Sequence, residues 1–475
     1  MSDHKHFLRA KTHFFKDLDL STVLVGEGHG DSNFTGTKII ATVGPSCQDV
    51  EVLSTLLDAG MVGARVDLTW GPLDFHRKSL DNLQSAMKKS RRLCATVVDT
   101  LGREVMVRRQ VKLGDDGWPM HEETFNITSG QTVVLTTRKD VDAANDLLPV
   151  TYDKFHTMVE KGDMIYVGRY LVCGADVASL YLEVKAVEGQ DVICLAHNDA
   201  VLDGLLTVFH TERSSSSLLN VQNDLGVLSE YDKECLGILA QDFEVDFLSL
   251  SYTREAADVK EARQFLDSIG MKTTKLLAKI ETRQSLINFQ DILNAADGII
   301  ISRGNLGLDV VPEKMALVQK TLIQACNLVG KPVIITRVVD TMVNTPRPTR
   351  AEATDVANAV LDGVDGIMLG AETLRGRYPL ETITTVTSIC RSGEKVFDHH
   401  YHYDHLMEVA IDASGLPIDS DEESEPAYHQ AHTVFPAASP LFNTQRGNKP
   451  PSCQAHHPRD TPPACEDGGP LLGLL

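Results

Sequence analysis

Short apolar runs rich in β-branched residues alternate along the chain with longer segments whose apolar positions recur at helical spacing. The apolar runs are eight in number and lie at residues 38–43, 63–69, 94–99, 245–251, 276–280, 298–302, 332–338 and 366–370. Helical spacing is clearest at residues 50–59, 285–296 and 312–328. Repeated strand–helix units predict a parallel sheet, and eight of them are the number that closes a (β/α)8 TIM barrel of the α/β class.

One connection is far longer than a strand–helix unit needs. About 140 residues separate the third apolar run from the fourth, and they contain short alternating runs with turn signals between them. These runs predict strands at residues 132–137, 164–167, 179–187, 192–196 and 205–209. We therefore expect an all-β domain inserted after barrel strand 3, at residues 105–217. Because it would emerge at the end of the barrel where active sites lie, it is placed to act as a lid.

The remaining boundaries follow from this organisation. Residues 1–36 form an N-terminal segment, and the barrel occupies residues 37–104 and 218–398 on either side of the insertion. Ten of the nineteen prolines lie after Gly415, together with an acidic run at residues 419–425. This composition lacks any periodic apolar pattern, so we expect residues 399–475 to be a disordered tail.

Charge and cysteine content narrow the class of protein. The chain has 45 Lys and Arg against 66 Asp and Glu, a formal net charge of −21, which disfavours nucleic acid and anionic membranes as partners. The nine cysteines are scattered without CxxC spacing, which argues against a disulfide framework or a zinc site. No apolar window is long enough for a membrane span or a secretory signal. These features predict a cytoplasmic protein.

Candidate chemistry lies where the predicted barrel strands end, because barrel enzymes place their active sites at the carboxyl ends of the strands. Cations there suit an anionic substrate, and side-chain oxygens suit hard metal ions. The polar residues at these ends are Arg65, Asp67, Thr69, Asp99, Thr100, Lys279, Glu281, Arg303, Asn305, Thr336, Arg337 and Glu372.

Lys279 and Glu281 are two apart on a predicted strand and therefore point to the same face. Their spacing is compatible with a plain ion pair at the end of the core. It is equally compatible with a lysine that neutralises a phosphoryl group beside a metal-holding carboxylate. Residues 302–307, Ser-Arg-Gly-Asn-Leu-Gly, are either an ordinary strand exit or a set of backbone N–H groups that holds a carboxylate or phosphate.

Several segments, in this order, resemble the pyruvate kinase family over about residues 37–398. They are TKIIATVGPS at 37–46, GARVD at 63–67, VDTLG at 98–102, AKIE at 278–281, ISRGNLG at 301–307, RPTRAE at 347–352, DVANAVLD at 355–362 and GAET at 370–373. The segments WG at 70–71, RGN at 303–305 and TRVVD at 336–340 are most similar to the plant cytosolic branch.

The resemblance implies transfer of a phosphoryl group from phosphoenolpyruvate to ADP, followed by protonation of the enolate to pyruvate. It implies that Lys279 and Arg65 stabilise charge on the phosphoryl group. The backbone amides of Gly304 and Asn305 and the Thr336 hydroxyl would hold the substrate carboxylate. Thr336 would also belong to the proton relay to the enolate carbon.

Two cation sites are also implied. Glu281 and Asn305 would hold a divalent ion, Mg²⁺ or Mn²⁺. The residues that match the family's monovalent-cation site are Asp67, Thr69, Asp99 and Thr100. Glu104 stands where potassium-dependent members carry Glu, which implies dependence on K⁺. The inserted domain would close over ADP.

The sequence departs from the family pattern at several places. Asn305 replaces an Asp, which removes one negative charge and predicts weaker divalent binding. Arg103 replaces a Pro, Val66 and Leu68 replace aromatic residues, and Arg213 begins an unusual serine run. By this resemblance we expect the family's C-terminal α/β domain to be missing after about residue 398.

Two hypotheses of different class follow from this pattern. In one the chain is a working pyruvate kinase whose partners are phosphoenolpyruvate, ADP, ATP and pyruvate, with a homo-oligomer formed through the barrel helices. In the other it is an inactive, truncated paralogue that binds a full-length kinase. A complete set of catalytic residues favours the first hypothesis, and the absent domain favours the second.

Overall fold

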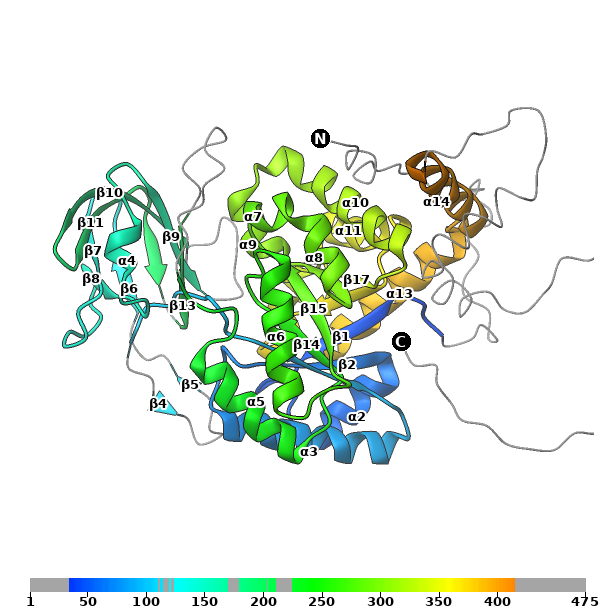
Figure 1. Cartoon of the computed structure of the whole chain (residues 1–475). Helices are drawn as coiled ribbons and strands as arrows, with labels where there is room; N and C mark the ends of the chain where they lie inside the picture. The colour runs from blue at the N-terminus through cyan, green and yellow to red at the C-terminus, as the bar shows by residue number, and fades with distance from the viewer. Residues whose placement is uncertain are drawn as a thin grey trace, which may run out of the picture.

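Eight parallel strands close into a barrel at the centre of the molecule (Figure 1). The structure is a computed structural model and describes residues 34–109, 112–113, 119–120, 124–169, 179–202, 204–210 and 224–414. The barrel strands are β1 (Lys38–Thr42), β2 (Met61–Asp67), β3 (Ala95–Asp99), β14 (Phe247–Leu250), β15 (Lys275–Ile280), β16 (Gly298–Ile301), β17 (Val333–Thr336) and β18 (Gly366–Leu369). They confirm the eight predicted strands, and β18 pairs with β1 to close the ring.

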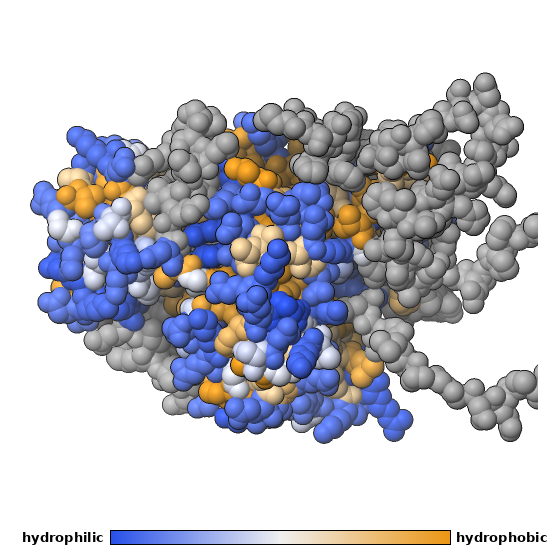
Figure 2. Space-filling view, viewed as in Figure 1, coloured by the Kyte–Doolittle hydropathy of each residue, from blue (hydrophilic) through white to orange (hydrophobic). Residues whose placement is uncertain are grey.

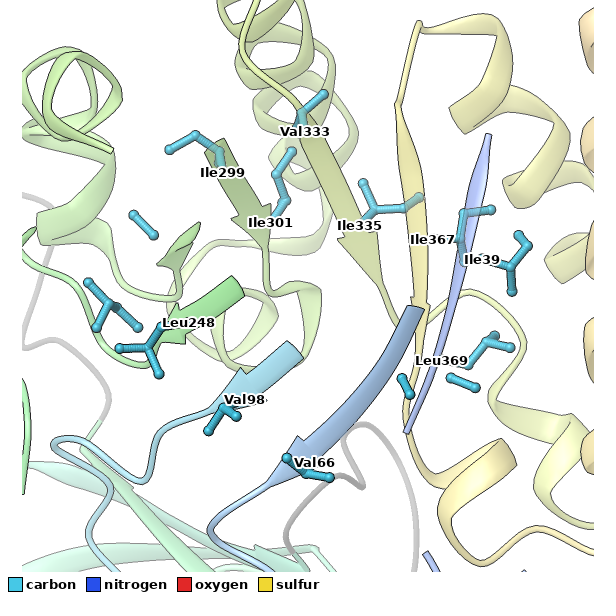
Figure 3. Close-up of a cluster of buried hydrophobic side chains, with 14 of the residues drawn as sticks. Ile39, Val66, Val98, Leu248, Ile299, Ile301, Val333, Ile335, Ile367 and Leu369 are labelled. Atoms are coloured by element: carbon cyan, nitrogen blue, oxygen red, sulfur yellow. The ribbon is translucent and has the colours of Figure 1, made fainter. Parts of the chain in front are cut away.

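Each barrel strand is apolar on both faces because one face fills the barrel and the other meets the surrounding helices. Ile40 and Ile300 belong to the small cluster formed by alternate strand positions. Their neighbours Ile39 and Ile299 belong to the larger cluster shared with the helices (Figure 3). This double burial explains why the strands appear in the sequence as continuous apolar runs.

Helices surround the barrel and alternate with its strands. They are α2 (Val50–Ala59), α3 (Leu73–Ser90), α5 (Glu230–Asp242), α6 (Ala256–Ser268), α7 (Arg283–Ile287), α8 (Phe289–Ala295), α9 (Arg303–Asp309), α10 (Pro312–Val329), η1 (Asp340–Val343), α11 (Arg350–Leu361), α12 (Ala371–Leu374), α13 (Pro379–Val396) and α14 (His399–Ser414). The helix predicted at 285–296 is in fact two. Asn288 separates α7 from α8, and its side chain donates a hydrogen bond to the carbonyl of Arg254.

The insertion between β3 and β14 forms a separate sheet-rich domain beside the barrel (Figure 1). Its elements are β4 (Lys112–Leu113), β5 (Pro119–Met120), β6 (Phe125–Ile127), β7 (Thr132–Thr136), β8 (Leu147–Pro149), α4 (Phe155–Met158), β9 (Met164–Arg169), β10 (Ser179–Glu188), β11 (Asp191–Ala196), β12 (Ala200–Leu202) and β13 (Leu206–His210). Six of the strands form one sheet in the order β13-β9-β10-β11-β7-β8. The five predicted strands are all present, but short strands and the one-turn helix α4 were not predicted, so the domain is not purely β.

The surface seen in Figure 2 is mostly hydrophilic, with smaller hydrophobic patches among the hydrophilic residues. Among the helices of the described ranges, none combines the length and the apolar character needed to cross a bilayer.

The expectation of a disordered tail from residue 399 is wrong for its first sixteen residues, which form α14. Leu406 and Ala410 are buried against Leu328 of α10, so one face of this helix is apolar. The histidines and tyrosines around these positions make that face hard to recognise from the sequence. Asp398 accepts hydrogen bonds from the backbone of His400 and Tyr401 and so caps the start of the helix. The rest of the predicted tail, residues 415–475, lies outside the described residues, as does the serine run after Arg213.

Arg103 connects both ends of the inserted domain to the barrel. Its guanidinium forms a bidentate pair with Asp258 of α6 at 2.6 and 2.8 Å. It also donates to the carbonyls of Leu225 (2.8 Å), where the chain re-enters the barrel, and of Tyr252 (3.0 Å). Burial alone would raise the pKa of Asp258, but the hydrogen bonds and charge of Arg103 lower it below its usual value. The departure from the family pattern at this position therefore has a structural role.

We expect Arg103→Met to lower the free energy of unfolding by about 3 kcal/mol, because it leaves a buried carboxylate without its cation. Urea unfolding measures this loss. The double variant Arg103→Met/Asp258→Asn should recover part of it, since the unpaired charge is then gone. An Arg103→Met protein as stable as the wild type would contradict the assigned role.

His402 is buried near the start of α14, and we expect its protonation to weaken the attachment of this helix. Its ring is buried against Phe397, with 5.2 Å between ring centroids. Burial, and then the neighbouring His405 and His399, lower the pKa of His402 from 6.5 to about 4. The unfolded chain therefore binds a proton between these values that the folded chain does not bind. This contribution to stability is complete above pH 6.5 and is lost as the pH falls toward 4.

We predict that the stability difference between the wild type and His402→Gln changes by about 1.4 kcal/mol per pH unit within this window. Urea unfolding at about pH 7, 6, 5.5 and 5 provides the measurement, with the wild type losing more stability on acidification. Parallel pH profiles for the two proteins would show that His402 is not responsible.

Candidate active site

The carboxyl ends of β2, β3 and β15 carry charged side chains that are almost fully buried. Arg65 and Asp67 lie at the end of β2, Asp99 ends β3, and Lys279 and Glu281 lie at the end of β15. Lys279 is 6% exposed, and the other four are 3% exposed or less. Residues two apart on a strand share a face, and the register places Asp67 beside Asp99. These strands therefore bring five of the predicted site residues to one mouth of the barrel.

Arg65 is held between two carboxylates. Its Nη2 lies 2.7 Å from Asp67 Oδ2, and its Nη1 lies 2.9 Å from Asp99 Oδ2. Burial raises the pKa of Asp67 above its ordinary value, and the nearby charge of Arg65 opposes this rise. The guanidinium is thereby fixed in one orientation at the barrel mouth.

Lys279 is held as an ammonium ion. Its Nζ lies 3.4 Å from Asp99 Oδ1 and 3.3 Å from Glu281 Oε1, and it donates a hydrogen bond of 3.1 Å to Ser251 Oγ. Burial alone would lower the pKa of Lys279, but the charges of Asp99 and Glu281 outweigh burial and raise it above its ordinary value. The sequence did not decide whether Lys279 and Glu281 form an ion pair, and the structure shows that they do. The pair keeps a positive charge beside a carboxylate suited to a metal ion.

Glu104 adds a further buried carboxylate next to this group. Burial raises its pKa to about 7, with an additional contribution from the charge of Glu281. The hydroxyl of Thr207, from the inserted domain, donates a hydrogen bond to it. Glu104, Asp67, Asp99 and Glu281 are four carboxyl groups around the two cations, Arg65 and Lys279. Because carboxyl groups outnumber cations, the site favours an additional bound cation.

The residues matched to a monovalent-cation site fit such an ion. The hydroxyl oxygen of Thr69 is buried and has no hydrogen-bond partner among the described residues, while the Thr69 backbone N–H donates to Asp67 Oδ1 at 3.0 Å. The carboxylates of Asp67 and Asp99, both paired with Arg65, and the hydroxyl oxygen of Thr69 are suitable ligand types for a hard cation. The Thr100 hydroxyl is engaged differently, since it donates to the Ser249 carbonyl and accepts from the Ser251 backbone.

Glu281 and Asn305 fit a divalent ion that is completed by substrate and water. Asn305 Nδ2 lies 3.2 Å from Glu281 Oε1, so the two side chains are neighbours at the ends of β15 and β16. Within the described part of the chain, no group of three or more His, Cys, Asp or Glu side chains is placed to hold a metal ion. Mg²⁺ characteristically takes one or two protein ligands together with phosphate and water, and this donor pair suits that pattern.

Gly304 and Thr336 lie on the neighbouring strand ends rather than among the carboxylates. Gly304 is in the first turn of α9, directly after β16, and Thr336 ends β17 with its hydroxyl 3.5 Å from the Ile301 carbonyl. Arg303 anchors this region through a bidentate pair with Asp355 and a 2.8 Å hydrogen bond to the Thr336 carbonyl. Arg303 is thus a structural residue, unlike most of the candidates at the strand ends.

Two other strand-end candidates make local contacts. Arg337, in a left-handed conformation with φ of 65°, lies 3.3 Å from Asp340. Glu372 accepts a hydrogen bond of 2.7 Å from the backbone of Gly370. Burial raises the pKa of Glu372, with a further contribution from the charge of Asp340.

Ser251 and Tyr252 belong to the site but were not predicted. Ser251 Oγ links Lys279 to the β3 exit, since it accepts from Lys279 and donates to the Thr100 carbonyl at 2.5 Å. The backbone N–H of Tyr252 donates to Glu281 Oε2 at 2.6 Å. The signal that would have found both is the strand-end rule applied to the fourth barrel strand.

Comparison with known proteins agrees with this geometry. A family profile described as pyruvate kinase, barrel domain, matches residues 34–383. The chain is 44% identical over 368 residues to a rice protein named pyruvate kinase 2, cytosolic, covering 77% of this chain and 67% of the rice protein. It is 33% identical over 403 residues to a soybean cytosolic pyruvate kinase isozyme, covering 85% of this chain and 73% of the relative.

The solved structures include a similar fold. A crystal structure of a pyruvate kinase from Cryptosporidium parvum superposes with a TM-score of 0.66 at 28% identity. The match covers 80% of this chain and 75% of that one, so it extends well beyond the barrel mouth.

Proposed function

The chain belongs to the pyruvate kinase family, and we propose that it transfers the phosphoryl group of phosphoenolpyruvate to ADP, giving pyruvate and ATP. The observation that carries this proposal is the buried Lys279 ammonium, held 3.4 Å from Asp99 and 3.3 Å from Glu281 beside the fixed guanidinium of Arg65. A phosphoryl group in transfer carries negative charge on its oxygens, and preorganised cations stabilise that charge.

In the proposed reaction, the bond between phosphorus and the enol oxygen breaks while a bond to a β-phosphate oxygen of ADP forms. Lys279 and Arg65 act on the phosphoryl oxygens throughout this exchange. Because both cations are already held by carboxylates, little reorganisation is needed when the substrate arrives. Their burial strengthens the interaction, since the effective dielectric constant is lower than in water.

The protein groups around the phosphoryl position have three further roles in this proposal. Glu281 and Asn305 hold Mg²⁺ or Mn²⁺, which neutralises phosphate charge when bound. The backbone N–H groups of Gly304 and Asn305, in the first turn of α9, hold the substrate carboxylate together with the Thr336 hydroxyl. Thr336 also passes a proton, through water, to the enolate carbon.

The monovalent ion is K⁺ in this proposal. Asp67, Thr69, Asp99 and Thr100 would hold it, and the buried Glu104 stands where potassium-dependent members of the family carry Glu. The inserted domain closes over ADP and excludes water from the transfer.

The location and assembly of the chain are proposed by similarity. The names of the rice and soybean relatives place those proteins in the cytosol, and we propose the same location here. We also propose a homo-oligomer formed through the barrel helices, with no nucleic-acid or membrane partner.

We predict that the purified chain produces pyruvate from phosphoenolpyruvate and ADP with Mg²⁺, and that turnover falls without K⁺. We also predict that Lys279→Met lowers kcat at least roughly 100-fold, which is the scale of losing one preorganised charge. A lactate dehydrogenase-coupled assay measures the rate. Lys275→Met is the matched control, because Lys275 lies at the other end of β15 with a 60% exposed side chain.

The expected control result is an unchanged rate for Lys275→Met and a melting temperature for Lys279→Met that still shows a folded protein. If the folded wild-type chain gives no pyruvate, the proposed activity is wrong, and a binding partner of an active kinase becomes the better account. If Lys279→Met keeps full activity, the role of the lysine is wrong.

A further inference from the structure

Tyr252 stands between the proposed divalent-cation ligands and the inserted domain. It lies two residues after the end of β14 and is 8% exposed. Its ring packs with Tyr166 and Phe209, which belong to strands β9 and β13 of the insertion. It is also one of three non-glycine residues with positive φ among the described residues, at 52°. A bulky residue persists in this conformation only where its surroundings determine it strongly.

Those surroundings are the two proposed ligands themselves. The Tyr252 backbone N–H donates to Glu281 Oε2 at 2.6 Å, and the Tyr252 hydroxyl accepts a hydrogen bond of 3.0 Å from Asn305 Nδ2. The same tyrosine also opposes the raised pKa of the buried Glu104 carboxyl. One tyrosine thus contacts both proposed ligands.

The direction of these hydrogen bonds fixes the Asn305 amide. A tyrosine hydroxyl oxygen can accept a hydrogen bond, and the Tyr252 hydroxyl accepts one of 3.0 Å from Asn305 Nδ2. Asn305 Nδ2 gives its second hydrogen to Glu281 Oε1 at 3.2 Å. Within the described ranges, both hydrogen bonds that the Asn305 side chain makes use nitrogen, and Oδ1 remains as the atom for a cation.

An amide needs this orientation in a way that a carboxylate does not. The two oxygens of an Asp are equivalent, so either can bind a metal ion. An Asn presents either an acceptor or a donor, and a donor turned toward a cation removes one ligand from the site. Groups that orient metal ligands in this way commonly change metal affinity by roughly 10–100-fold when they are removed.

We propose that Tyr252 is a positioning residue that turns the carbonyl oxygen of the Asn305 amide toward the divalent cation, so that the hydroxyl at 252 and the amide at 305 work as a pair. The inference rests on the proposed function, because it takes Glu281 and Asn305 as the ligands of that cation.

The test is Mn²⁺ binding to the full chain in K⁺ buffer without substrates, measured by electron paramagnetic resonance of free Mn²⁺. Tyr252→Phe keeps the ring and removes the hydroxyl, and we expect it to raise the Kd for Mn²⁺ roughly 10-fold. Tyr166→Phe is the matched control. It removes a hydroxyl from the same aromatic cluster, but that hydroxyl bonds Ser179 Oγ at 3.1 Å and is not bonded to Asn305. Its Kd should equal that of the wild type.

The variant Asn305→Asp separates orientation from general damage to the site. In that background the ligand has two equivalent oxygens, so adding Tyr252→Phe should change the Kd less than about 2-fold by the same reasoning. Equal effects of Tyr252→Phe in the wild-type chain and in the Asn305→Asp variant would show a structural role and overturn the proposal. Melting temperatures of all variants confirm that each protein is folded.

The outcomes also separate this inference from the proposed function. An unaltered chain that binds no Mn²⁺ contradicts the assignment of Glu281 and Asn305 as ligands, and both ideas fall. If the unaltered chain and Tyr252→Phe bind Mn²⁺ with the same Kd, only the positioning role is contradicted.

Discussion

The buried charges at the carboxyl ends of β2, β3 and β15 must be paired with one another, and the surrounding structure has to hold them in place. Asp99 contacts both cations, with Arg65 Nη1 at 2.9 Å and Lys279 Nζ at 3.4 Å, and therefore joins two barrel strands into one polar group. Such a group is costly to bury unless each charge is paired, and it is held by a barrel whose strands are otherwise apolar on both faces. The fold provides rigidity here, and the charges provide the chemistry.

The inserted domain depends on the same region. Arg103 follows the exit of β3 and pairs with Asp258, while Gly102, with φ of 56°, brings this loop close to the backbone carbonyls of Ser251 and Val227. A side chain at position 102 would meet those carbonyls at 3.0–3.1 Å. Tyr252 then packs against aromatic residues of the insertion. The inserted domain is thus connected to the buried charges of the barrel mouth through a few residues that all lie where β3 and β14 end.

The sequence predicted most of this arrangement because its signals are local. Continuous apolar runs locate barrel strands that are buried on both faces. The strand-end rule then places Arg65, Asp99, Lys279 and Glu281 at one barrel mouth from their positions in the sequence alone. Contacts between distant segments were not predictable in this way. The pair of Arg103 with Asp258, the hydrogen bonds of Tyr252 with Glu281 and Asn305, and the packing of α14 on α10 each join segments far apart in the chain. A spacing pattern within one segment does not contain that information.

The central claim is that the excess negative charge at the barrel mouth is balanced by bound cations. The most direct measurement compares the melting temperature of the full chain in KCl with that in tetramethylammonium chloride at equal ionic strength, so that general screening is the same. A cation that binds only the folded chain, present at about 100 times its Kd, adds about 2.7 kcal/mol of stability. The account predicts a melting temperature several degrees higher in KCl, and a difference that disappears in Asp99→Asn. Equal melting temperatures of the wild-type chain in the two salts would contradict it.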